Sequence, residues 1–128
     1  MKRSRELAAK LLRKAAQDQF VVEKLLPDPN SPEDLIGFHA QQAVEKTLKA
    51  ILALAFVPYA HTHDLLELID LVRTKGFDFP PDLEEVKRLT TFAVGFRYEE
   101  LQPPFDRAWA LDCVRRTRAW AEGILGKS

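Results

Sequence analysis

The pattern of apolar and polar positions along this chain predicts helices throughout. No segment alternates cleanly between apolar and polar residues with the period of two that is typical of a half-buried strand. The eight prolines fall in clusters between long proline-free stretches, and proline usually begins or ends a helix. We therefore predict an all-α chain with five helices, over residues 3–26, 32–56, 64–75, 82–96 and 105–125. Because the connections are short, we expect an up-and-down antiparallel bundle of four to five helices, in one domain over residues 1–128.

The predicted helix 32–56 has an unusually wide apolar face. On a wheel of about 100° per residue its apolar side chains cover roughly 200°, more than a surface helix needs. We therefore expect this helix to lie at the centre of the bundle. The polar side chains on its remaining arc are His39, Gln42, Glu45, Lys46 and Lys49. Gln41 falls inside the apolar arc, and we interpret it as a hydrogen-bonded core or interface glutamine, with direct ligand contact as the alternative.

The last predicted helix, 105–125, is amphipathic in the ordinary way. Its apolar stripe consists of Phe105, Trp109, Cys113, Thr117, Trp120 and Ile124. The arginines that face away from this stripe are Arg107, Arg115 and Arg118. We interpret the tryptophans as core residues rather than as a platform for stacking bases, and Cys113 as a buried, unreactive thiol.

Capping signals support these boundaries. We expect Ser31 to cap the second helix, with a proline at the first helical position. Asp64 and Asp82 each precede a glutamate by three residues, which is the spacing of a capping box. Gly76 and Gly126 lie where glycine commonly ends a helix.

The composition is that of an ordinary globular protein, with 46% hydrophobic and 30% charged residues. Nineteen Lys and Arg balance nineteen Asp and Glu, which argues against a strongly basic nucleic-acid clamp. The charge is uneven, however, since residues 1–17 hold six basic residues against one acidic, and residues 78–100 hold three against six. A basic first helix could touch phosphate or an acidic partner, although a solvated face is the simpler interpretation. The single cysteine, the absence of a long apolar run and the charged N-terminus predict a cytoplasmic protein without a disulfide or a membrane span.

The candidate chemistry rests on histidine and arginine. The sequence has no glycine-rich phosphate loop, no nucleophile elbow and no metal-binding motif, so we expect no metal and no cofactor. His63 beside Asp64 could be a base with an orienting acid, although such a pair at a helix start is more often a cap. Arg97 and Tyr98 could bind phosphate and stack a base, or the arginine could neutralise a helix C-terminus. Spacing alone favours neither interpretation.

Three segments resemble signatures of the HEPN family, the higher eukaryotes and prokaryotes nucleotide-binding domain. Residues 38–50, Phe-His-Ala-Gln-Gln-Ala-Val-Glu-Lys-Thr-Leu-Lys-Ala, resemble the second helix of the family. His63-Asp64-Leu65 resembles its His-Asp-Leu element, and Arg97-Tyr98 resembles its Arg-Tyr-Pro element. The resemblance covers nearly the whole chain and fits the stand-alone prokaryotic type. It implies a helical bundle that is often dimeric and that pairs with a minimal nucleotidyltransferase, often as a toxin–antitoxin system.

The resemblance also bears on catalysis. Ribonucleases of the family use an Arg-x4–6-His motif, in which residues from two subunits meet at the dimer interface. No histidine follows Arg97 in this chain, and Glu99 stands where the family has proline. The resemblance therefore favours a protein without catalytic activity. The alternative is a metal-independent ribonuclease toxin in which His63 supplies the acid or base from another position.

The leading hypothesis is thus a homodimer that binds a nucleotide or RNA, a nucleotidyltransferase partner, or both. In it Arg97 and Tyr98 contact phosphate and base, while Lys46 and Lys49 add positive charge. The residues expected to order the site or an interface are Gln41, Gln42, Glu45 and Asp64. A plain interaction module, in which all these polar residues are structural, is a third interpretation.

Overall fold

The computed structural model describes residues 2–57, 61–93 and 106–126, and within these it has five helices and no strand. The elements are α1 (Lys2–Leu25), α2 (Glu33–Leu54), α3 (Leu65–Thr74), η1 (Pro81–Phe92) and α4 (Arg107–Leu125). The predicted all-α fold is confirmed, and the described helix ends lie within a few residues of those predicted. The fourth element differs in kind, because it is a 3-10 helix and not an α-helix.

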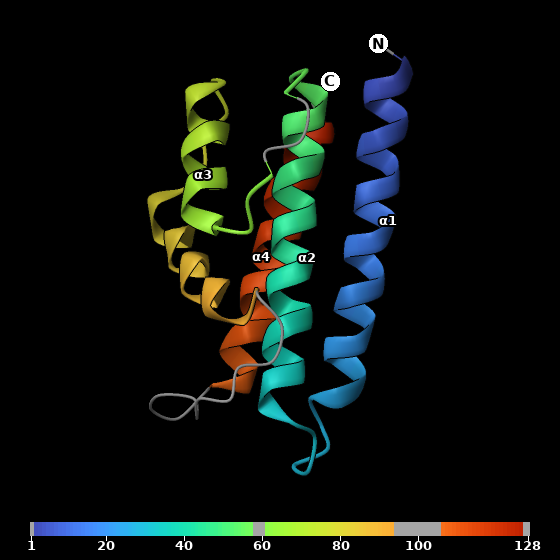
Figure 1. Ribbon diagram of the computed structural model, residues 1–128, viewed down its shortest axis with the longest axis vertical. Coiled ribbons are helices and arrows are strands. Elements are labelled where there is room, and N and C mark those ends of the chain that lie inside the picture. The colour runs from blue at the N-terminus through green and yellow to red at the C-terminus, as the bar shows by residue number, and fades with distance from the viewer. Residues whose placement is uncertain (1, 58–60, 94–105, 127–128) are drawn as a thin grey trace.

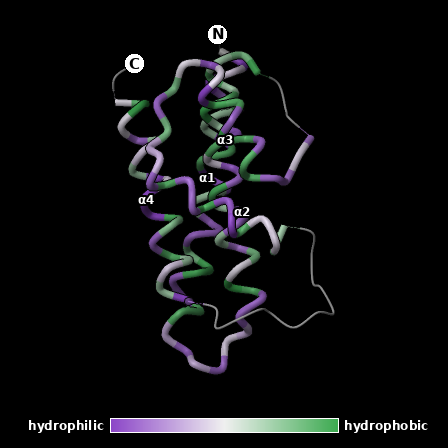
Figure 2. Tube along the Cα trace, turned by 90° about the vertical axis from the view of Figure 1, so that its left-hand side faces the viewer, coloured by the Kyte–Doolittle hydropathy of each residue, from purple (hydrophilic) through white to green (hydrophobic). Residues whose placement is uncertain are grey.

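The helices pack around α2. It contacts α1, α3, η1 and α4, and 13 of its 22 residues are buried. The wide apolar arc therefore predicted its central position correctly. Hydrophobic and hydrophilic positions are interspersed along each helix, so that each helix can bury one side (Figure 2). The main core contains residues from every helix, among them Val22, Leu48, Ile69, Leu89 and Val114.

The direction of α3 decides which loop reaches the middle of the bundle. α1 and α2 form the antiparallel hairpin that a short connection predicts (Figure 1). α3 instead runs in the same direction as α2, because the chain returns toward the middle of α2 before α3 begins (Figure 1). A hydrogen bond of 3.3 Å from the Gln41 side chain to the His63 carbonyl holds this return in place.

α4 packs against the core and contacts α1 through its arginines. Within the described residues its predicted apolar stripe packs inward, with Cys113 and Thr117 fully buried and Trp109 and Trp120 partly buried against the core. Phe105, the first residue of that stripe, lies outside the described residues. The three arginines predicted to face away from this stripe reach α1 and the loop that follows it. Arg107 donates to the carbonyls of residues 26, 28 and 31, and Arg115 and Arg118 contact Glu23 and Gln19.

The predicted helix starts were partly wrong. Asp64 caps α3 as expected, since its carboxylate accepts a hydrogen bond of 3.0 Å from the Leu66 amide. The backbone N–H of Asp64, however, donates to the Thr62 hydroxyl, so this is not a reciprocal capping box with a glutamate. Ser31 does not cap α2, whose capping position is the following proline, without a side-chain cap. Asp82 lies inside the first turn of η1, because that helix already begins at Pro81.

Two helices end in a Schellman motif, and one of them does so without glycine. After α3, Gly76 has φ +91°, and the amides of residues 76 and 77 bond back to the carbonyls of 73 and 72. After α2 the same pair of bonds forms, but the left-handed residue is Phe56, with φ +61°. Its side chain is 62% exposed. Gly126 also ends α4 as predicted, although with an ordinary right-handed φ of −69°.

Candidate functional site

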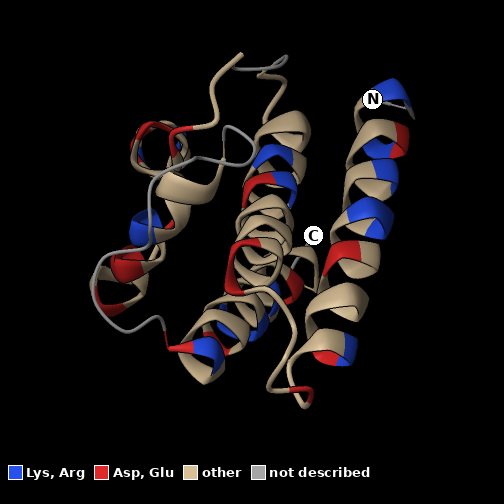
Figure 3. Cartoon of the chain, turned by 60° about the horizontal axis from the view of Figure 1, so that its bottom comes forward, with Lys and Arg blue, Asp and Glu red and all other residues tan. Residues whose placement is uncertain are grey.

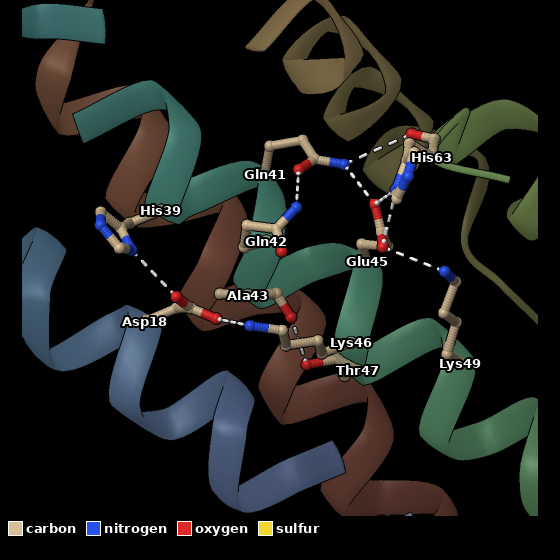
Figure 4. A network of polar contacts seen from close by, with 10 residues as sticks. All are labelled: Asp18, His39, Gln41, Gln42, Ala43, Glu45, Lys46, Thr47, Lys49 and His63. Atoms are coloured by element: carbon tan, nitrogen blue, oxygen red, sulfur yellow. Dashed lines mark hydrogen bonds and ion pairs between the residues drawn. The ribbon is translucent and has the colours of Figure 1, made fainter. Parts of the chain in front are cut away.

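The polar arc of α2 places a carboxylate inside the bundle. Glu45 is only 4% exposed, and its two oxygens accept hydrogen bonds from three side chains (Figure 4). The donors are Gln41 Nε2 at 2.8 Å, Lys49 Nζ at 3.0 Å and His63 Nδ1 at 3.0 Å. We call the group Gln41, Gln42, Glu45, Lys49 and His63 the α2 polar cluster.

Hydrogen bonds keep the Glu45 carboxyl ionised. Burial alone would raise its pKa, but the bonds from Gln41, Lys49 and His63 outweigh burial and lower the pKa below its ordinary value. An ionised carboxylate can only accept hydrogen bonds. The hydrogen between Glu45 and His63 therefore resides on Nδ1 of the imidazole.

The two glutamines complete the cluster. Gln41 is fully buried, and its amide nitrogen bonds both to Glu45 and to the His63 carbonyl. Gln42 donates to the Gln41 oxygen at 2.7 Å. No buried side-chain nitrogen or oxygen in the described residues is left without a partner. The prediction that Gln41 is a satisfied core glutamine is confirmed.

His63 is the member of the cluster that opens to solvent. Its side chain is 59% exposed, whereas that of Glu45 is 6% exposed. With Nδ1 bonded to Glu45, the Nε2 edge of the ring is available for a proton or a ligand. The backbone that follows His63 is also held, because Asp64 caps α3 and the Leu65 amide donates to the Thr90 hydroxyl of η1.

Lys46 and Lys49, which the sequence analysis assigned to one phosphate site, contact different carboxylates. Lys49 belongs to the α2 polar cluster, and its side chain is only 13% exposed. Lys46 faces α1, where Asp18 accepts from it at 2.7 Å and from His39 Nδ1 at 2.9 Å (Figure 4). Each ammonium group is thus already paired with a carboxylate inside the fold.

Asp18 is a buried residue that the sequence reasoning did not single out. It is 7% exposed on α1 and joins two side chains of α2. A helical wheel of α1 gives the signal, because at about 100° per residue Asp18 falls on the side that holds Ala15 and Val22. A charged residue on an apolar stripe needs a partner from a neighbouring element.

The remaining predicted site residues lie outside the described part of the chain. These are Arg97 and Tyr98, with the neighbouring Glu99.

Among the described residues no three His, Cys, Asp or Glu side chains gather to hold a metal ion. No described helix is long and apolar enough to cross a membrane. The Cys113 thiol is buried, and burial raises its pKa to about 12, as expected of an unreactive cysteine.

Fold and site together define a class of protein: a small helical bundle whose central helix holds a histidine-bearing loop through a buried carboxylate. Comparison with models of protein families identifies the family. The model of the HEPN domain matches residues 8–124, which is most of the chain, and the chain therefore belongs to the HEPN family. No curated protein and no solved structure gives a significant match.

Proposed function

We propose that this HEPN protein binds a phosphate-bearing ligand, a nucleotide or an RNA, at the exposed edge of His63. The observation that carries the proposal is the pairing of an exposed imidazole with a buried carboxylate. Glu45 fixes the orientation of the ring, and the imidazolium form presents an Nε2–H that can donate to a phosphate oxygen. From the sequence we also expect Arg97 and Tyr98 to contact phosphate and base.

The proposal assigns Lys46 and Lys49 a supporting role. Both are bonded to carboxylates, so a phosphate would have to displace Asp18 or Glu45 to bind them. Lys49 instead balances the charge of Glu45 within the α2 polar cluster. The direct contacts to phosphate then come from His63 and Arg97.

Thermal unfolding with added ATP and AMP tests this proposal. A ligand that binds only the folded protein raises Tm, by a free energy of RT ln(1 + [L]/Kd). We expect a rise for the wild type that is lost in His63→Ala and in Arg97→Ala. The matched control is His39→Ala, which removes the histidine bonded to Asp18 and leaves the α2 polar cluster intact. An equal rise in all four proteins, or none in the wild type, would contradict the proposal.

A second candidate function is RNA cleavage without a metal. It is favoured by one observation, the Nδ1 contact between His63 and Glu45, which is how a carboxylate orients a general base. We rank it below binding, because no histidine follows Arg97 to complete the Arg-x4–6-His motif. Incubation of labelled RNA with the protein in chelator at neutral pH distinguishes the two. Cleavage by the wild type that is lost in His63→Ala would establish the enzyme.

HEPN membership also supports a protein partner. We propose a cytoplasmic homodimer that pairs with a minimal nucleotidyltransferase in a toxin–antitoxin-like system. Light scattering after size exclusion is expected to give twice the 14.6 kDa of the chain. Co-expression with a minimal nucleotidyltransferase is expected to yield a complex. A 14.6 kDa species, or recovery of the two proteins apart, would count against this part of the proposal.

A further inference from the structure

We propose that the outer face of α1 is a binding track for single-stranded nucleic acid, separate from the α2 polar cluster. α1 carries seven Lys and Arg against three Asp and Glu, a net charge of +4 in a chain whose total is zero. Figure 3 shows basic positions recurring along α1.

The charges on this face are free to meet an outside anion. Arg3, Lys10, Arg13 and Lys14 are exposed, and within the described residues none of them pairs with a carboxylate. Most cations elsewhere on the described chain are already engaged. Those paired with Asp or Glu are Lys46, Lys49, Arg73, Lys87, Arg115, Arg116 and Arg118.

The acidic residues of α1 do not cancel this charge. Asp18 is buried against α2, and Glu23 is bonded to Arg115 on α4. Glu6 is the one carboxylate of α1 that stays exposed without an ion pair in the described structure. The outer face therefore keeps a positive excess along its N-terminal half.

The spacing of the cations suits a linear polyanion. At about 100° and about 1.5 Å per residue, positions 3, 10, 17 and 24 lie within about 60° of one another and about 10 Å apart along the helix. Arg3, Lys10 and Lys24 occupy three of these four positions, and Arg13 and Lys14 flank the row. A rigid row of about 30 Å can follow a phosphate backbone without reading its sequence.

An exposed aromatic ring lies on the same face and favours nucleic acid over an acidic protein. Phe20 is 58% exposed, although it is large and apolar. On the wheel it falls within about 40° of Arg13 and Lys24, and the Lys24 ammonium lies 5.3 Å from the ring centroid. Proteins that bind single strands without sequence preference combine a positive track with aromatic rings on which bases stack.

Fluorescence anisotropy of a labelled single-stranded RNA of about 20 nucleotides tests the proposal. The double variant Arg13→Gln with Lys14→Gln removes two phosphate contacts from the track. With a salt slope of about −0.7 per contact for single strands, we expect binding at about 50 mM salt to weaken tenfold to a hundredfold. We expect the slope itself to fall by about 1.4. Phe20→Ala is expected to weaken binding at least about fivefold with the slope unchanged.

The control is the double variant Lys75→Gln with Lys87→Gln, which loses the same charge from exposed positions at the end of α3 and on η1. It is expected to bind RNA like the wild type. Equal weakening in both double variants, or no RNA binding by the wild type at about 50 mM salt, would overturn the proposal. Tighter binding of a labelled poly-glutamate peptide than of RNA would also overturn it and assign the face to an acidic protein.

His63→Ala separates the track from the proposed phosphate site. We expect this variant to bind RNA at the α1 track as tightly as the wild type does. Failure of the phosphate site and failure of the track therefore give different results. Melting followed by circular dichroism checks that the double variant folds. If it does not, Lys10→Gln alone is used, with an expected weakening of about eightfold for one lost contact at about 50 mM salt.

Discussion

Replacing Glu45 by alanine removes the acceptor on which the α2 polar cluster depends. The change leaves the Gln41 amide and the Lys49 ammonium without their closest acceptor. Gln41 is fully buried, and the Lys49 side chain is only 13% exposed. Breaking a buried ion pair on one side typically costs about 3–5 kcal/mol. We expect the lower end of this range, because the long Lys49 side chain can move toward solvent. For a chain of this length the loss corresponds to a Tm lower by roughly 10 °C or more.

Glu45→Gln is a milder change, because the amide oxygen can still accept from one donor. We expect it to cost about 1–2 kcal/mol, from the loss of charge in the remaining hydrogen bonds. Urea unfolding followed by circular dichroism gives both free energies of unfolding. Glu122→Ala is the matched control, since Glu122 is 63% exposed and, among the described residues, its one ion pair is with Arg118 one turn away. Its cost is expected to stay below about 0.5 kcal/mol.

The pH dependence provides an independent check. The pKa of Glu45 is lowered in the folded protein, so its ionised form stabilises the fold above the ordinary value of 4.5. This stabilisation is lost as the pH falls from 4.5 through the lower folded pKa. The wild type should therefore lose more stability over that interval than Glu45→Gln does. Parallel acid profiles for the two proteins, or an alanine variant as stable as Glu122→Ala, would refute the reasoning.

Four other changes have defined outcomes. His63→Ala should cost less than about 1 kcal/mol in urea unfolding, because its ring is 59% exposed; a larger loss would make His63 a structural residue. Gly37→Ala would put a Cβ 2.5 Å from the Phe92 ring, so we expect a loss of about 1–3 kcal/mol that Phe92→Leu partly restores, and additive costs would contradict this contact. Phe56→Gly should raise the free energy of unfolding by about 0.5–1 kcal/mol, because glycine adopts the left-handed backbone without strain, whereas Phe56→Ala should not. An equal gain in both variants would show that removing the exposed ring, and not the positive φ, changes the stability. Cys113 should resist iodoacetamide at pH 8 until the protein unfolds, as followed by mass spectrometry, and fast labelling of the folded protein would show that its thiol is accessible.

The helices could be predicted because their evidence is local. Proline clusters and apolar spacing depend only on neighbours in the sequence, and they placed all five helical elements. The 3-10 form of η1 could not be predicted in this way, since its residues carry ordinary helical spacing. The direction of α3 also escaped prediction, because it depends on how far the chain returns along α2 and not on any residue pattern.

The site was predictable in its members but not in its arrangement. A wheel of α2 put Glu45, Lys46 and Lys49 on one polar arc, which suggests that all three face solvent. The loop that carries His63 covers part of this arc and buries Glu45, while Asp18 on α1 engages Lys46 from the other side. Both contacts join residues at least 18 positions apart in the sequence, so no helical wheel contains them.

The costs of changing Glu45 and His63 bear on why a carboxylate lies in this position. An apolar side chain packed among apolar neighbours is often as stable as a buried ion pair, so stability alone does not require Glu45. A carboxylate can do what an apolar residue cannot, which is to fix the proton on Nδ1 and the orientation of the imidazole. If His63→Ala costs little while Glu45→Ala costs several kcal/mol, the buried cluster supports the histidine and not the reverse. If the two variants lose equal free energy of unfolding, the Glu45–His63 hydrogen bond is a structural contact that holds the loop before α3 against α2. The phosphate-binding proposal would then lose the observation that carries it.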